Sequence, residues 1–138
     1  MRVTVDNNVV ISAFLWGGNP RRVLNAARSG SIDIFTSAEL LAELSDVLSR
    51  RQFEKPLIAV NSSADAILDQ YRALAHKVRA KDIEPVILRD PDDDSVLACA
   101  ISSGSDFIVT GDKDLLDIKE YRSIPILMPK VFLDVIEI

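Results

Sequence analysis

Apolar and polar residues follow two different rhythms along this chain, one typical of buried strands and one of amphipathic helices. Short apolar runs bounded by turn residues predict strands at residues 2–5, 31–36, 84–89, 106–110 and 124–128. Apolar residues at three- and four-residue spacing predict helices at residues 8–16, 21–30, 37–50, 63–78 and 129–138, with another from about residue 90. Strands that alternate with helices indicate a parallel sheet covered on both faces, which is an α/β fold.

The helix predicted at residues 37–50 carries the clearest signals. Leu40, Leu44 and Leu48 form one apolar stripe, and Ser37 stands where a capping residue is expected. The sequence therefore predicts that this helix begins directly after the second strand.

Length and composition indicate one domain covering residues 1–138, since there is no internal repeat or Gly/Ser linker. No stretch approaches the ~20 apolar residues that cross a bilayer, so no membrane association is expected. Asp6 interrupts the first apolar run, which does not read as a signal peptide. The single cysteine, Cys99, fits a reducing compartment, and we expect a cytoplasmic protein.

The net charge of −5 argues against a broadly basic surface that follows nucleic-acid phosphates. The charge is unevenly spread, however. If six of the 21 acidic residues gather at one site, the remaining 15 face 16 basic residues. Acidity is therefore weak evidence against a nucleic-acid substrate.

Acidic residues stand where three predicted strands end. Asp6 follows the first strand, the acid-rich segment of residues 90–94 follows the third, and Asp112 follows the fourth. In open α/β sheets, ligands bind at the carboxyl ends of the strands. Each acid alone could be a turn or cap residue, but three strand ends in agreement indicate a shared site.

Part of the segment DPDDDSVLACA is explained by helix capping alone. Asp90 can cap the helix, Pro91 suits its first position, and Asp93 completes a capping box. Carboxylates near a helix N-terminus are also favoured by its dipole. This explanation leaves Asp94 without a role.

On a helical wheel, Asp94 lies beside Ala98 and Ile101, so we expect it to face the sheet. A buried carboxylate without a partner costs several kcal/mol, and a cation would remove that cost. Glu43 borders the apolar edge of its own helix and raises a milder form of the same question. Taken alone, such a glutamate is more often a solvent-exposed residue beside the apolar face of a helix than a metal ligand.

The segment VTGDKDLL adds Asp112 and Asp114 after the fourth strand. One of them can cap the next short helix, or both can point into the crevice. Several carboxylates without histidine or cysteine suit hard ions such as Mg²⁺ or Mn²⁺, and disfavour zinc. Such ions can orient and help deprotonate water and stabilise an in-line phosphoryl displacement. The residues therefore predict a Mg²⁺ or Mn²⁺ site that acts on phosphate esters.

Four segments, taken together, resemble the PIN domain family, and in particular its VapC-like toxins. VDNNVVISAFLWGG is similar to the first acidic motif, SAELLAEL to the second, DPDDDSVLACA to the third and VTGDKDLL to the fourth. The matching acids are Asp6, Glu43, Asp94 and Asp112, with Asp92 and Asp114 as supporting candidates. One departure is Asn7, where the family commonly has a hydroxyl residue.

The resemblance implies a three-layer α/β/α sandwich with a parallel five-stranded sheet of order 3-2-1-4-5. It implies a metal-dependent endoribonuclease that cleaves RNA phosphodiesters with an activated water. The protein would be the toxin of a type II toxin–antitoxin pair, with a cognate antitoxin as partner and a homodimeric state.

Within this resemblance, Asp6, Asp94 and Asp112 are expected to ligate the metal, and Glu43 to ligate through water or position the nucleophile. Asn8 and Thr110 would hold either the carboxylates or a metal-bound water in place. Arg21 and Arg22 open the second helix near the end of the first strand, and they are the candidates for contact with RNA phosphates.

Three other functions compete with this one. A signalling receiver domain also has a Mg²⁺-binding acidic pocket, but its late strand is followed by a lysine, where this chain has Asp112. A non-catalytic PIN scaffold is disfavoured by the complete set of acids. A structure-specific DNA nuclease would use the same metal chemistry, so substrate assays must separate RNA from DNA.

Overall fold

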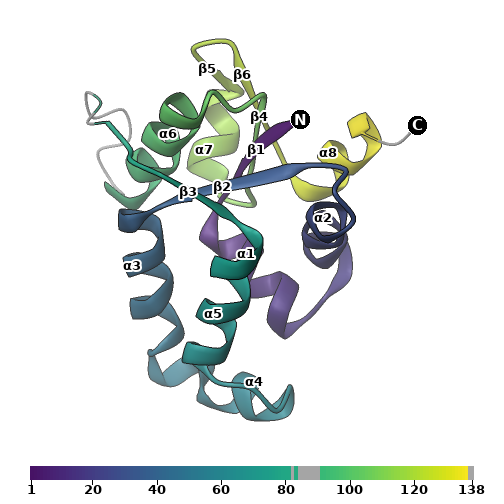
Figure 1. The fold of residues 1–138 in the computed structure, drawn as a ribbon, viewed down its shortest axis with the longest axis vertical. Coiled ribbons are helices and arrows are strands. Elements are labelled where there is room, and N and C mark those ends of the chain that lie inside the picture. Colours follow the sequence, from purple (N-terminus) through teal and green to yellow (C-terminus); the bar gives the residue numbers. More distant parts are fainter. Residues whose placement is uncertain (82, 84–90, 137–138) are drawn as a thin grey trace.

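The computed structural model describes residues 1–81, 83 and 91–136, and its strands form one largely parallel sheet (Figure 1). The strands are β1 Arg2–Val5, β2 Asp33–Ser37, β3 His76–Val78, β4 Phe107–Val109, β5 Glu120–Tyr121 and β6 Ile124–Leu127. Their order is β3-β2-β1-β4-β6-β5, and only the pair β5–β6 is antiparallel. The parallel part therefore has the predicted order, and β5 adds a short edge strand.

Helices cover both faces of this sheet. They are α1 Asn7–Leu15, α2 Gly18–Arg28, α3 Ala38–Leu48, α4 Glu54–Ala59, α5 Ala64–Leu74, α6 Pro91–Ser103, α7 Lys113–Ile118 and α8 Pro129–Ile136, with a 3-10 turn at Arg51–Phe53. The predicted three-layer α/β/α class is confirmed. The 3-10 turn, α4 and β5 were not expected from the sequence.

The core consists of two buried clusters, because side chains of a strand alternate between the two faces of the sheet. Val3 and Val5 of β1 and Ile34 of β2 point to the first cluster, which includes residues of α1, α2, α5 and α8. Phe35 points to the second cluster, which is built largely from α6 and the segment around α7. The sheet therefore separates two hydrophobic layers, and helices close each of them.

The helix predicted at residues 63–78 is wrong beyond Leu74. Ala75 is extended, and His76 to Val78 form β3, which pairs with β2 in parallel. The apolar spacing alone would allow the helix to continue, but the open edge of β2 offers hydrogen bonds to an extended segment. The strand predicted at residues 84–89 lies outside the described residues.

Candidate metal centre

Three carboxylates from distant parts of the chain meet at the carboxyl edge of the sheet. Asp6 follows β1, Asp93 lies in the first turn of α6, and Asp112 precedes α7. One carboxylate oxygen of each lies within 4.8 Å of those of the other two. We call Asp6, Asp93 and Asp112 the acid triad.

The sheet brings two of these acids together. Strands β1 and β4 are parallel neighbours, and Val5 pairs with Val109 in their register. The Asp6 N–H donates to the Val109 carbonyl at 2.9 Å, so the two strand ends leave the sheet side by side. Asp6 and Asp112 therefore meet because parallel strands end at the same edge.

Thr110 links the two acids through its hydroxyl. Its Oγ1 donates to Asp6 Oδ2 at 2.7 Å and accepts from the Asp112 N–H at 2.9 Å. Asp112 Oδ1 in turn accepts from the Asp114 N–H at 3.0 Å, and so caps α7. The carboxylate of Asp112 thus both begins a helix and belongs to the acid triad.

Burial makes the negative charge of Asp6 costly. The side chain is 4% exposed, and desolvation raises the pKa of its carboxyl above the ordinary value. The Thr110 hydroxyl opposes this increase in pKa, the nearby charge of Asp112 adds to it, and the backbone N–H groups of Asn8 and Asn7 oppose it. A cation among the three carboxylates would favour their ionised forms.

The donor set fits a hard divalent ion. Within the described part of the chain, the group offers carboxylate oxygens from Asp6, Asp93 and Asp112 and includes neither His76 nor Cys99. Oxygen-only sets of this kind suit Mg²⁺ and Mn²⁺, whereas zinc prefers nitrogen and sulfur ligands.

The orientation predicted for Asp94 is corrected by the phase of α6. Val96, Leu97, Cys99 and Ala100 are 0–1% exposed, and Ala98, one turn after Asp94, is 7% exposed. Asp93 lies one turn before Leu97 and is 3% exposed, whereas the neighbouring Asp94 points in another direction and is half-buried. Asp93 therefore occupies the place in the acid group that the sequence analysis expected for Asp94.

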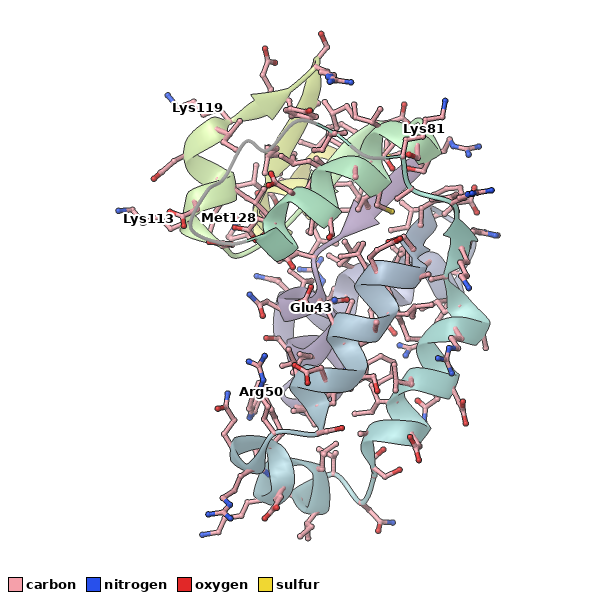
Figure 2. The ribbon with its side chains drawn as sticks, turned by 90° about the vertical axis from the view of Figure 1, so that its left-hand side faces the viewer. Glu43, Arg50, Lys81, Lys113, Lys119 and Met128 are labelled. Carbon is pink, nitrogen blue, oxygen red and sulfur yellow. The ribbon has the colours of Figure 1, made fainter. Side chains whose placement is uncertain are left out.

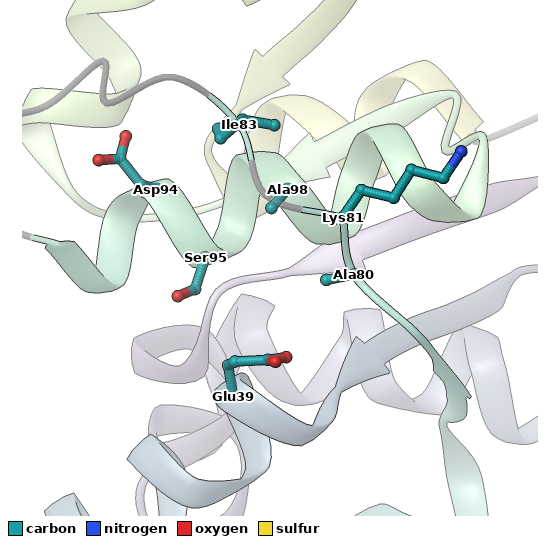
Figure 3. A pocket seen from close by; sticks show the side chains of 7 residues that line it. All are labelled: Glu39, Ala80, Lys81, Ile83, Asp94, Ser95 and Ala98. Carbon is teal, nitrogen blue, oxygen red and sulfur yellow. The ribbon is translucent and has the colours of Figure 1, made fainter.

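Asp94 instead lines a small cavity outside the acid triad (Figure 3). This cavity has a volume of about 140 Å³, and its lining includes Asp94 and Ser95 of α6 and Glu39 of α3. In Figure 3, Glu39 lies across the cavity from the helix that carries Asp94. Asp94 is thus near the sheet edge but outside the acid triad.

Among the side chains that the structure describes, Glu43 and Asp114 are not part of the acid triad. Glu43 is half-buried on α3 and lies on the same side of the molecule as Lys113 and Met128 (Figure 2). Asp114 is half-buried in the first turn of α7. Asp92 belongs to α6, and its side chain is outside the part that the structure describes.

The two predicted arginines differ in their surroundings. The Arg21 Nε donates to the Ala13 carbonyl at 2.9 Å, which attaches the start of α2 to α1. The Arg22 Nη1 donates to Asn19 Oδ1 at 3.3 Å in an exposed position. Arg22 is therefore better placed than Arg21 to contact an external phosphate.

Asn7 has a structural role that the sequence analysis did not assign. It is 1% exposed, and its Nδ2 donates to the Leu40 carbonyl at 2.8 Å. This bond attaches the segment after Asp6 to the first turn of α3, the helix that carries Glu43. A polar residue between Asp6 and the apolar run of α1 was the only signal for it in the sequence.

The parallel sheet, with carboxylates gathered at its carboxyl edge, defines an α/β domain whose donor set fits a divalent cation. A family model of the PIN domain matches residues 2–114, which is most of the chain. The chain therefore belongs to the PIN domain family, whose members are generally nucleases, and the predicted resemblance is confirmed.

The fold is also similar to that of a solved structure, VapBC2 from Rickettsia felis bound to a DNA fragment from their promoter. The match has a TM-score of 0.63 at 15% sequence identity and covers 91% of this chain and 97% of that one. A comparison with curated proteins gave no match. Family membership removes the receiver-domain alternative.

None of the helices in the described ranges is both long and apolar enough to span a membrane.

Proposed function

We propose that this PIN domain protein is an endoribonuclease that depends on Mg²⁺ or Mn²⁺ and hydrolyses RNA phosphodiesters. The observation that carries the proposal is the acid triad, in which Asp6, Asp93 and Asp112 approach within 4.8 Å at the sheet edge. Three carboxylates held this closely repel one another, and a hard cation is the partner that their chemistry fits. Membership in a family of nucleases supports the same reaction class.

The acid triad would hold the ion, which when bound supplies positive charge that stabilises the pentavalent phosphate and the attacking water. Thr110 holds the Asp6 carboxylate in one orientation through a buried hydrogen bond. Asp114 holds Asp112 through its backbone N–H. Glu43, half-buried on α3, is proposed to ligate the ion through water or to position the attacking water. Asn8 is proposed to hold the Asp6 carboxylate through its backbone N–H.

The test compares two adjacent aspartates. Asp93→Asn should lower Mn²⁺-dependent cleavage of single-stranded RNA by at least about 100-fold, because it removes one carboxylate of the triad. Asp94→Asn, one residue away and outside the triad, should lower it by less than about fivefold. Single-turnover assays with labelled RNA, run beside the same sequence as DNA, measure both effects and the sugar preference.

Three results would contradict the proposal. Full activity of Asp93→Asn would show that the triad is not needed for catalysis. A larger loss for Asp94→Asn than for Asp93→Asn would show that Asp94 is the metal ligand, as the sequence predicted. The absence of cleavage by the unmodified protein with Mg²⁺ and Mn²⁺ would favour a non-catalytic scaffold. Cleavage of DNA alone would favour a DNA nuclease.

We also propose partners for this protein. The similarity of fold to the toxin–antitoxin complex VapBC2 supports the proposal that this chain is the toxin of a type II pair with its own antitoxin. A neighbouring gene for a small DNA-binding protein that relieves growth arrest on co-expression would support it, and no growth effect would contradict it. A homodimer, a cytoplasmic location and an RNA contact by Arg21 and Arg22 are also proposed, the first of which light scattering tests directly.

A further inference from the structure

A second, larger cavity opens beside the acid triad. Its volume is about 430 Å³, within the range of roughly 300–1,000 Å³ found for sites that bind small ligands. The walls come from α1, the start of α2, the loop after β4 and the junction between β6 and α8. The lining residues used below are Asn8, Ser12, Asn19, Gly111, Met128 and Lys130.

The cavity is joined to the triad through the chain itself. Asn8 lies two residues after Asp6, and Gly111 directly precedes Asp112. A β-carbon built on Gly111 would meet no other atom within 4 Å, so the loop leaves open space at this point. A strand whose phosphate lies at the triad would therefore place a neighbouring nucleotide at this cavity.

The chemistry of the walls fits a planar ring with polar edges. The amides of Asn8 and Asn19 and the hydroxyl of Ser12 offer both donors and acceptors, as do the edges of nucleobases. The remaining lining is mainly apolar and includes Met128, which is labelled in Figure 2 and is 46% exposed. Apolar walls with a few polar groups are typical of sites that select one ring system.

The charges at the rim are positive where a phosphodiester backbone would pass. Lys130 is exposed, and its Nζ lies 3.6 Å from Asp134 on the same helix, a contact at the surface that water screens. Arg22 is bonded to the lining residue Asn19 through its Nη1 at 3.3 Å. A base in the cavity would thus have two cations, Lys130 and Arg22, near the adjacent phosphates.

We propose that this cavity binds one nucleobase of the RNA strand next to the scissile phosphate and so determines base preference. The inference rests on the proposed nuclease function, because the acid triad defines where the scissile phosphate lies. Asn19 and Asn8 would read the base edge, and Met128 would cover the ring.

The test measures binding and leaves cleavage aside. Asp6→Asn provides a background in which the proposed reaction is disabled, and fluorescence anisotropy gives its Kd for labelled decamers of A, C, G and U. The weakest and tightest decamers should differ by about fivefold or more. Gly111→Leu, which fills the open space, and Asn19→Ala, which removes one amide, should each reduce this ratio to below about twofold.

Ala73→Leu is the matched control, because it places the same side chain at another surface hollow, on α5 away from the acid triad. Its ratio should stay at that of the background protein. Thermal melting identifies any variant that fails to fold. If Gly111→Leu does not fold, the ratio measured for Asn19→Ala still tests the proposal.

An unchanged ratio in folded Gly111→Leu and Asn19→Ala overturns the subsite, as does equal binding of all four decamers by the background protein. The two proposals fail separately. If the unmodified protein does not cleave RNA but the ratio depends on Gly111 and Asn19, the nuclease proposal fails and base recognition stands. If cleavage occurs and the ratio ignores both residues, the subsite alone fails.

Discussion

The hydroxyl of Thr110 makes two hydrogen bonds, and both hold the candidate site together. It donates to Asp6 and accepts from the Asp112 N–H, and its side chain is fully buried. A hydroxyl can do both at once, whereas an apolar side chain of the same shape can do neither. Thr110 is therefore the residue that sets the distance between two carboxylates of the acid triad.

Thr110→Val should weaken Mn²⁺ binding by roughly 10- to 100-fold, the range found when groups behind metal ligands are removed. It should also lower the free energy of unfolding by about 1–3 kcal/mol, because a buried carboxylate oxygen loses its donor. Isothermal titration with Mn²⁺ and urea unfolding measure these two effects. Thr110→Ser keeps the hydroxyl and should retain most of the affinity; equal losses in both variants would show that the methyl group matters and not the hydrogen bond.

At the scale of elements, the first turn of α3 is held at two points. Ser37 Oγ accepts from the Leu40 N–H at 3.2 Å, and the Leu40 carbonyl accepts from Asn7. The first bond joins the helix to the end of β2, and the second joins it to the segment that follows Asp6. The position of Glu43 relative to the triad depends on both.

Ser37→Ala should lower the free energy of unfolding by about 1 kcal/mol, the usual cost of losing an N-cap. Ser63→Ala is the matched control, because Ser63 caps α5 through the Ala66 N–H at 3.1 Å in the same way. Both variants should lose stability in urea, Ser37→Ala more than Ser63→Ala because its cap is buried. Only Ser37→Ala should also reduce cleavage measurably, since α3 carries Glu43. Equal cleavage activity of the two variants would show that the cap of α3 does not position the site.

At the scale of the whole molecule, the acid triad couples folding to a cation. Burial raises the pKa of Asp6, so its ionised form costs stability in the metal-free protein. A carboxyl whose pKa is raised on folding stabilises the protein at pH values low enough to keep it protonated. That contribution is lost as the pH rises through the folded-state pKa.

Mn²⁺ at 100 times its Kd should raise the free energy of unfolding by about 2.7 kcal/mol, because only the folded chain assembles the triad. Asp6→Asn should abolish most of this gain and should stabilise the metal-free protein. This stabilisation should increase as the pH rises from the ordinary carboxyl pKa to the raised folded-state pKa of Asp6, and level off above it. Calorimetry at several pH values, with and without Mn²⁺, measures both effects. A metal-free Asp6→Asn less stable than the unmodified protein would contradict the electrostatic account, and two separate transitions would contradict the single domain.

The positions of two triad acids could be predicted because they depend on chain direction alone. Asp6 and Asp112 each follow an apolar strand, and parallel strands place their carboxyl ends at one edge. The cap of α3 at Ser37 was readable for a similar reason, since capping is a local interaction between residues three apart. Short-range chemistry and strand direction were sufficient for these features.

The third acid was decided by tertiary packing. Neighbouring positions on a helix differ by about 100° in direction, so the choice between Asp93 and Asp94 depends on how α6 is rotated against the sheet. Both positions continue a buried apolar row, to Leu97 in one case and to Ala98 in the other, but only Asp93 is buried and lies with Asp6 and Asp112. Tertiary packing also decided the conformation of residues 76–78. Their apolar spacing suits a helix, but they pair with the edge of β2 and form β3.

The sequence by itself therefore determined the α/β class and the edge at which the acids gather, because local periodicity and chain direction are encoded by neighbouring residues. The order of the parallel strands was implied by the resemblance to the PIN domain family. Only the tertiary structure decided which acid of α6 joins Asp6 and Asp112, that Asn7 attaches α1 to α3, and that a second cavity opens beside Gly111. These depend on the rotation and spacing of elements far apart in the chain, which are set when the two hydrophobic layers pack on the sheet.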